Sequence, residues 1–164
     1  MNYQRSTRYA LYAALEMAAA APDEPVTAAR VAAKYRLPAS AVAKVFQRLV
    51  PAGIALGTRG VAGGYRLARP PAAITVLEVV EAFESPRRPG DCLLDTCGAE
   101  GCDHLAECRL RQLFDEVDEQ ARATFGSVTL ATLVAPRQPL LVALPAPRHP
   151  ASVTPTRSSR AASR

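Results

Sequence analysis

Residues 39–69 read ASAVAKVFQRLVPAGIALGTRGVAGGYRLAR, and this stretch decides the fold. Its first eleven residues carry apolar side chains at helical spacing, namely Val42, Val45, Phe46 and Leu49. Two short extended runs follow, residues 54–58 and 65–69, with a glycine-rich loop between them. The stretch therefore predicts a helix that stops near Gly53 and is followed by a β-hairpin.

Two further helices are predicted upstream of this stretch. The apolar stripe of the first consists of Leu11, Ala14, Leu15 and Ala18. Ser6 or Thr7 is its expected N-cap, because a hydroxyl oxygen can accept a hydrogen bond from the first turn, and Pro22 follows its end. The stripe of the second helix consists of Ala28, Val31, Ala32 and Tyr35. Thr27 is its expected N-cap.

Two helices, a short turn, a third helix and a hairpin are the layout of a winged helix-turn-helix, in which the third helix enters the DNA major groove. The solvent-facing side of that helix carries Ser40, Ala43, Lys44, Gln47 and Arg48. Its Ser, Lys and Gln side chains can bond base edges, and Arg48 is expected to hold phosphate. At the hairpin tip, Arg59 beside Gly60 can reach into the narrow minor groove.

The charge of +5 is unevenly distributed along the 164 residues. Residues 1–70 carry ten Lys or Arg and three acids, and residues 71–134 carry five Arg and twelve acids. A basic front half points to a polyanionic partner, here double-stranded DNA. Residues 135–164 carry five Arg, six Pro and no acid, and this composition predicts a disordered basic tail.

Two more helices are expected between the hairpin and the tail. Thr75 and Glu78 have the spacing of a capping box, which opens a helix through Val76, Val79, Val80 and Phe83. After Cys108, apolar positions alternate steps of four and three at Leu110, Phe114, Val117, Ala121, Thr124 and Val128. That period of 3.5 residues is typical of a helix packed along another helix, so we expect a homodimer. Packing on the chain's own core is the alternative.

The four cysteines lie at Cys92, Cys97, Cys102 and Cys108, with His104 among them. Four thiolates can hold a 2Fe–2S or a 4Fe–4S cluster, and an imidazole can replace one of them. Structural zinc is less favoured, because its cysteines usually come in two tight pairs. A thiol or disulfide switch without metal is a further alternative.

Several stretches resemble the IscR/NsrR/BadM-type transcriptional regulators. They are residues 6–11 (STRYAL), 59–70 (RGVAGGYRLARP), 74–76 (ITV), the cysteines running into 108–111 (CRLR), and 128–134 (VTLATLV). The resemblance spans residues 1–134 and leaves out the tail. It implies a dimeric winged helix-turn-helix protein with a long crossed helix between protomers, and an iron–sulfur cluster that tunes DNA binding.

Individual positions carry over by this resemblance. Ser40 and Lys44 would act from the recognition helix and Arg59 from the wing, whereas Ala43 lacks the polar side chain of other members. Arg8 stands where some members have an Asp that ligates the partner's cluster, so a cluster here needs other ligands. Cys92 and Cys108 match the outer two of the family's three cysteines. Cys97 or Cys102 matches the middle one.

The expected fold class is mainly α with a small β-wing. The expected organisation is a DNA-binding domain with its following helix (1–84), a cysteine-rich cluster loop (85–108), a dimerisation helix with a short C-terminal helix (109–134) and a disordered tail (135–164). The expected function is that of a cytoplasmic, homodimeric DNA-binding repressor that senses redox state, iron supply or nitric oxide through its cluster.

An enzyme is not expected, because the chain has two His and no nucleophile, P-loop or dinucleotide motif. No run of 18 apolar residues or secretion signal is present, so no membrane association is expected. Three alternatives stay open: a thiol-redox or zinc-stabilised regulator, a small iron–sulfur electron-transfer protein, and a metal-free interaction module.

Overall fold

The structure, a computed structural model, describes residues 3–60, 63–85 and 107–136. Its elements are α1 (Arg5–Ala19), α2 (Ala28–Tyr35), α3 (Ala39–Leu49), β1 (Ala55–Thr58), β2 (Gly64–Leu67), the 3₁₀ turn η1 (Pro71–Ala73), α4 (Val76–Glu81), α5 (Arg109–Ser127) and α6 (Leu130–Val134). The two strands form one antiparallel sheet. The predicted fold class, mainly α with a small β-wing, is confirmed. No helix in the described ranges is both long and apolar enough to cross a membrane.

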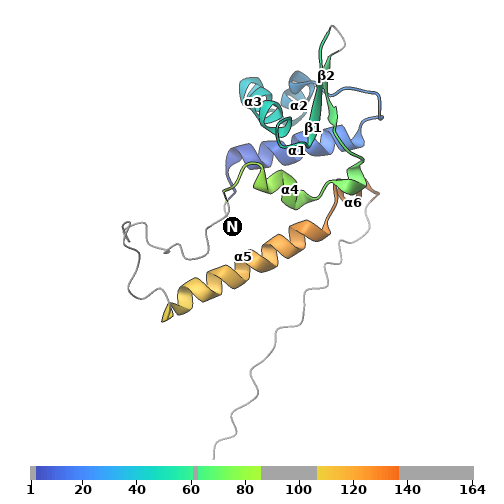
Figure 1. Cartoon of the computed structure of the whole chain (residues 1–164). Helices are drawn as coiled ribbons and strands as arrows, with labels where there is room; N and C mark the ends of the chain where they lie inside the picture. The colour runs from blue at the N-terminus through green and yellow to red at the C-terminus, as the bar shows by residue number, and fades with distance from the viewer. Residues whose placement is uncertain (1–2, 61–62, 86–106, 137–164) are drawn as a thin grey trace, which may run out of the picture.

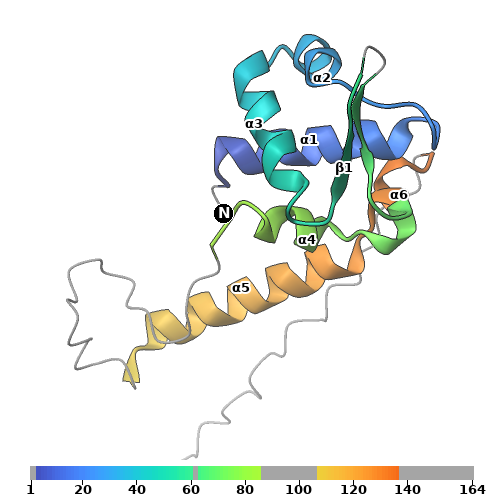
Figure 2. The ribbon, with the colours of Figure 1, turned by 45° about the horizontal axis from the view of Figure 1, so that its top comes forward.

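Helix α1 is the central element of the N-terminal unit, residues 3–85. It packs against α2, α3, α4 and α6, with α2 and α3 on one side and α4 on the other (Figure 1). The predicted stripe of α3 is fully buried: Val42, Val45, Phe46 and Leu49 are at most 2% exposed. The hairpin stands beside α3 and crosses the C-terminal half of α1 (Figure 2).

The predicted stripe of α1 is displaced by about one residue. The fully buried apolar side chains are Ala10, Ala13, Ala14 and Met17, whereas Leu11, Leu15 and Ala18 are half-buried. Small side chains occupy the centre because several neighbouring elements approach α1 closely, and the larger leucines fit only at its margins. The period was predicted correctly, but the position of the stripe around the helix was wrong.

The predicted N-cap of α1 was also wrong. The helix begins at Arg5 with Gln4 as N-cap, so Ser6 and Thr7 lie in the first turn. The backbone N–H of Gln4 donates to Glu84 Oε1 at 2.8 Å, and the Thr7 hydroxyl donates to the same oxygen at 2.5 Å. A carboxylate at a helix N-terminus satisfies unpaired N–H groups and complements the helix dipole. Glu84, just beyond α4, therefore holds the start of α1.

The ends of α2 and α3 follow the local sequence signals closely. Thr27 caps α2 as predicted, and its hydroxyl accepts from the backbone N–H of Arg30 at 3.1 Å. Pro38 is the N-cap residue of α3. Helix α3 ends at Leu49, just before the Val50–Pro51 pair, and Gly53 adopts a left-handed backbone with φ of 70°. Glycine is suited to that conformation because it has no Cβ.

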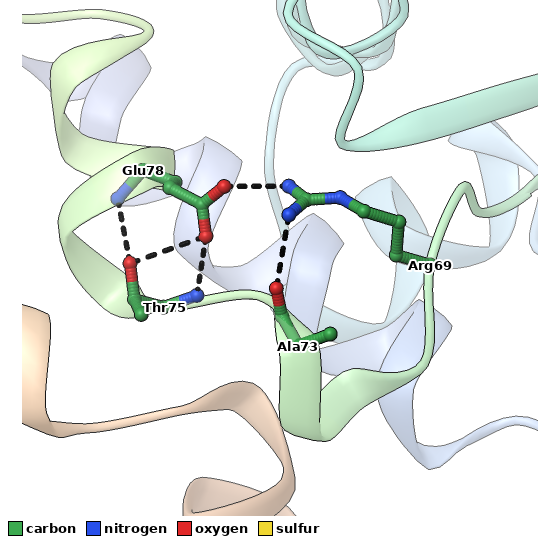
Figure 3. Close-up of polar contacts among 4 residues, drawn as sticks. All are labelled: Arg69, Ala73, Thr75 and Glu78. Atoms are coloured by element: carbon green, nitrogen blue, oxygen red, sulfur yellow. Dashed lines mark hydrogen bonds and ion pairs between the residues drawn. The ribbon is translucent and has the colours of Figure 1, made fainter.

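A cluster of polar contacts connects the end of the hairpin to α4 (Figure 3). The capping box forms as predicted, because Thr75 Oγ1 accepts from the Glu78 N–H and Glu78 Oε2 accepts from the Thr75 N–H. Arg69 also donates to the Ala73 carbonyl at 3.0 Å and to Glu78 Oε1 at 2.6 Å. Burial alone would raise the pKa of Glu78, but the Thr75 and Arg69 hydrogen bonds lower it overall.

Helix α5 meets the N-terminal unit near the C-terminal end of the helix. The Val76 N–H donates to the Val128 carbonyl and the Leu130 N–H donates to the Ile74 carbonyl, both at 2.9 Å. Val128 is extended and follows the last helical residue, so the predicted apolar stripe of the helix ends before it. The N-terminal end of α5 runs away from α1 and α3 (Figures 1 and 2). No side chain of α5 is buried.

Candidate nucleic-acid interface and the start of the cysteine segment

The wing is a short hairpin whose loop depends on glycine. Its register pairs Ala55 with Leu67 and Thr58 with Gly64, which leaves Arg59 exposed just past the end of β1. Gly60 has a φ of 118°, which is rarely accessible to other residues. A Cβ on Gly63 would lie 2.5 Å from the Thr58 carbonyl oxygen. The loop therefore brings the two strand ends together and leaves Arg59 accessible.

The outer face of α3 presents the predicted polar side chains. Ser40, Lys44, Gln47 and Arg48 are all exposed. Ala43, between them, is half-buried. The opposite side of the helix is anchored by its four buried apolar residues, so this face is fixed toward solvent. Such a face can place hydrogen-bonding side chains in a major groove.

Nine of the ten Lys and Arg residues of the N-terminal unit fall into two groups. Three have acidic partners in the described structure: Arg30 with Glu24, Lys34 with Glu16, and Arg69 with Glu78. Other exposed cations form no ion pair with any described residue, and these are Arg5, Arg8, Arg36, Lys44, Arg59 and Arg66. The second group includes the α3 cation and the wing arginine. Its charge is available to an anionic partner such as a DNA backbone.

Arg48 has an intramolecular contact that sequence reasoning missed. Its guanidinium carbon lies 4.9 Å from the centre of the buried Phe83 ring, beyond α4. A cation over an aromatic face is attracted by the negative π-cloud. The side chain remains exposed, so the contact does not block a phosphate. The i, i+4 pattern could not reveal it, because Phe83 is 35 positions away.

A buried carboxylate fixes α2 against α1 behind the interface. Glu16 is 5% exposed and accepts from Lys34 Nζ at 2.5 Å and from the Tyr35 hydroxyl at 2.7 Å. Burial alone would raise the pKa of Glu16, but these two hydrogen bonds lower it overall. Burial and the Glu16 carboxylate raise the pKa of Tyr35 to about 12. The sequence indicates this cluster only through a single Glu in an alanine-rich helix.

Of the predicted cluster ligands, only Cys108 lies within the described residues. It is a free, half-exposed cysteine at the N-cap position of α5. Cys92, Cys97, Cys102 and His104 lie outside the described residues. Within the described ranges, no three His, Cys, Asp or Glu side chains gather as a metal site. The donor types in the sequence, four thiols and one imidazole, fit an iron–sulfur cluster.

Comparison with known proteins agrees with this geometry. Residues 3–136 match the family model Rrf2, described as an iron-dependent transcriptional regulator. A Rhodopseudomonas palustris protein named as the HTH-type regulator BadM is 37% identical over 134 residues, 82% of this chain and 81% of the relative. IscR of Xenorhabdus nematophila is 31% identical over 143 residues, 87% of this chain and 85% of the relative.

Solved structures share the fold. CymR of B. subtilis, described as the global cysteine regulator, aligns with a TM-score of 0.66 at 24% identity, covering 84% of this chain and 99% of that one. IscR of T. potens aligns with a TM-score of 0.63 at 22% identity, covering 81% and 85%. The recognition helix, the wing and the match over residues 3–136 lead to one conclusion: this chain belongs to the Rrf2 family of transcriptional regulators, which bind DNA and are not enzymes.

Proposed function

We propose that this DNA-binding regulator is a cytoplasmic homodimeric repressor whose operator binding is controlled by an iron–sulfur cluster. The carrying observation is the exposure of Lys44 and Arg59, which form no ion pair with any described residue, on the two elements that a winged helix-turn-helix presents to DNA. The family description as iron-dependent supports the cluster. The resemblance supports repression, in which the dimer occupies a promoter.

The proposed DNA contacts divide between the two grooves. Ser40, Lys44 and Gln47 would meet base edges in the major groove, and Arg48 would hold a phosphate near the end of α3. Arg59 and the backbone of Gly60 would meet the minor groove. A lysine that reads a base changes sequence preference, whereas one that holds phosphate changes affinity for all sequences.

The proposed dimer would form through α5. Its N-terminal half exposes four large apolar side chains: Leu110, Leu113, Phe114 and Val117. They lie at i, i+3, i+4 and i+7, one continuous stripe along the helix. A second copy of the same helix would cover this stripe with an identical one, as two-fold symmetric interfaces do. Two recognition helices could then bind successive half-sites.

The proposed cluster ligands are Cys92, Cys97, Cys102 and Cys108, with His104 as an alternative ligand. The N-cap position of Cys108 supports its assignment, because a residue at the start of a rigid helix is fixed in direction. A bound cluster would supply sensitivity to oxidants, iron supply or nitric oxide. The same cysteines without metal would make a thiol-redox regulator, and four thiolates on zinc would make a structural site.

Two measurements test the proposal. Binding to a duplex selected by the chain from a randomised pool tests DNA recognition: Arg59→Ala should cost about 1–3 kcal/mol and flatten preference at the wing contact. Unchanged affinity at physiological salt would remove the minor-groove role. Anaerobic purification with an absorption spectrum and iron, sulfide and zinc counts tests the cofactor.

The metal counts separate the three cysteine chemistries. Iron and sulfide in equal amounts, lost in Cys92→Ala or Cys108→Ala, would support the cluster. Stoichiometric zinc, or four metal-free thiols, would replace it with one of the alternatives. A Cys108→Ala variant that kept a full cluster would remove Cys108 from the ligand set.

A further inference from the structure

Tyr65, in the second strand of the wing, is stacked on the recognition helix. Its ring lies 4.3 Å from the centre of the Phe46 ring, with only 12° between the two planes. Phe46 is fully buried on the inner face of α3, opposite the polar face proposed to meet DNA. The wing therefore touches α3 through a flat contact between two rigid rings, which fixes distance and tilt better than flexible aliphatic side chains would.

The backbone of Tyr65 is held from the other side. Its N–H donates to the Val26 carbonyl at 2.9 Å, and its carbonyl accepts from the Val26 N–H at 2.8 Å. Val26 is fully buried and directly precedes Thr27, the N-cap of α2. Tyr65 thus joins the wing to the start of α2 through its main chain and to α3 through its side chain.

Two glycines make room for this arrangement. A Cβ on Gly64 would lie 3.0 Å from the Val26 carbonyl oxygen and 3.1 Å from the Pro25 Cβ, so glycine permits the close approach of the two segments. Gly57 pairs with Tyr65 across the hairpin, and a Cβ there would lie 3.6 Å from the Tyr65 ring. The ring leans over a strand position that has no side chain of its own.

A hairpin with strands of four residues is only marginally ordered on its own. Its direction must therefore come from what it is attached to. Ile54 and Ala55 are buried in the core at the base of the hairpin, and Tyr65 attaches β2 to α2 and α3 nearer the tip. Arg59 lies two residues beyond Gly57, the cross-strand partner of Tyr65. The position of the arginine relative to α3 depends on this residue.

We propose that Tyr65 is the positioning residue that sets the wing relative to the recognition helix, so that Arg59 and the α3 side chains reach DNA together. This inference rests on the proposed DNA contacts of Arg59 and Lys44. Removing the ring lets the hairpin tilt. The wing then loses its minor-groove contact, whereas α3 keeps its contacts in the major groove.

A double-mutant cycle on the full chain tests the proposal. The probe is a duplex that the wild-type chain selects from a randomised pool, measured at one salt concentration. In the wild type, Arg59→Ala should lower affinity by about tenfold or more. In the Tyr65→Leu background, Arg59→Ala should lower it by less than about twofold, since its contact is already lost. Lys44→Ala should have the same effect in both backgrounds.

Hydroxyl-radical footprinting supplies a readout that lost stability alone would not change. Tyr65→Leu should lose minor-groove protection at the wing position and keep protection where α3 lies. Tyr65→Phe keeps the stacked ring and should keep both. If circular dichroism shows that Tyr65→Leu does not fold, Gly57→Val takes its place. Gly57 is exposed, and the methyl groups of the introduced valine would displace the Tyr65 ring. Gly57→Ala is the matched control, since a Cβ alone has room.

The outcomes separate this inference from the proposed function. Full additivity, with Arg59→Ala equally costly in both backgrounds, would overturn the inference and leave DNA recognition intact. A wild-type chain that selects no sequence would overturn the proposed function, and the inference with it. An Arg59→Ala variant with wild-type affinity would overturn the wing contact and the positioning role together.

Discussion

Helices α3 and α5 carry similar apolar stripes, but the described chain covers only one of them. The four apolar residues of the α3 stripe are at most 2% exposed. Those of α5 remain open, from 43% exposed at Val117 to 63% at Leu110. A periodic pattern therefore predicts that a stripe exists and not what covers it. The core of the N-terminal unit is closed with the help of Leu130 from α6, which is fully buried there. Helix α5 requires cover from elsewhere, which we propose is a second copy.

Truncation of one large side chain in each helix should show the greatest contrast. Phe46→Ala removes a fully buried ring and should lower the free energy of unfolding by about 3–5 kcal/mol in urea titrations. Leu110→Ala, at a position 63% exposed, should cost less than about 1 kcal/mol where the chain is monomeric. Equal losses at both positions would contradict the division into a closed core and an open helix.

A charge placed in the open stripe should break the proposed dimer. Leu113→Asp buries a carboxylate in an apolar interface, so the dimer dissociation constant should rise by about 100-fold or more in sedimentation equilibrium. Gln112→Asp is the matched control, because its neighbouring exposed position faces away from the stripe. A wild-type chain that stays at 17.4 kDa at high concentration would exclude this dimer.

The features that were predictable from the sequence are those with partners nearby in the chain. Thr27 and the Thr75–Glu78 capping box act within three residues, and both formed as predicted. The cap of α1 was missed because its acceptor, Glu84, lies 80 positions from Gln4. The Glu16 cluster and the Val26–Tyr65 bridge join segments 18 or more positions apart. Only tertiary packing creates such contacts.

The same distinction between local and distant partners applies to the candidate site. The exposure of Lys44 and Arg59 followed from the helical period and the loop glycines. The Arg48–Phe83 contact and the two attachments of Tyr65 could not be predicted in this way. These contacts depend on how the wing and α4 pack against α3. The ligand assignments at Cys92, Cys97, Cys102 and His104 stay predictions outside the described residues.

The buried carboxylate of Glu16 should give the N-terminal unit a pH-dependent stability. Glu16→Gln should cost about 1–2 kcal/mol at pH 7, because it weakens hydrogen bonds to a charged group. The folded-state pKa of Glu16 lies below its ordinary value of 4.5, so its contribution is present above pH 4.5 and is lost as pH falls further. The difference between the two proteins should shrink toward pH 3 in urea titrations. A constant difference from pH 7 to pH 3 would contradict the lowered pKa.

Substitutions of two glutamates near the end of α4 test the N-terminal unit and α5 separately. Glu84 holds the first turn of α1, and Glu81 pairs with Arg122 of α5. Glu84→Ala should lower the free energy of unfolding by about 1 kcal/mol, the usual cost of a lost N-terminal cap. Glu81→Ala breaks an ion pair whose arginine is half-exposed and should cost less than about 0.5 kcal/mol. The opposite ranking would mean that α5 stabilises the unit more than α4 stabilises α1.

The last prediction concerns Arg36, where the N-terminal unit keeps a local backbone strain. Arg36 ends α2 in a left-handed backbone with φ of 53°, the conformation that Gly53 adopts after α3. That conformation costs a residue with a Cβ about 1–2 kcal/mol, and glycine costs about 0.5–1 kcal/mol of chain entropy. Arg36→Gly should therefore raise the free energy of unfolding by up to about 1.5 kcal/mol in thermal denaturation, at every protein concentration. Gly53→Ala should lower it, since the added Cβ meets no atom within 4 Å and strain alone acts there. A destabilised Arg36→Gly variant would show that the arginine side chain holds the turn through its own contacts and offsets the strain of its backbone.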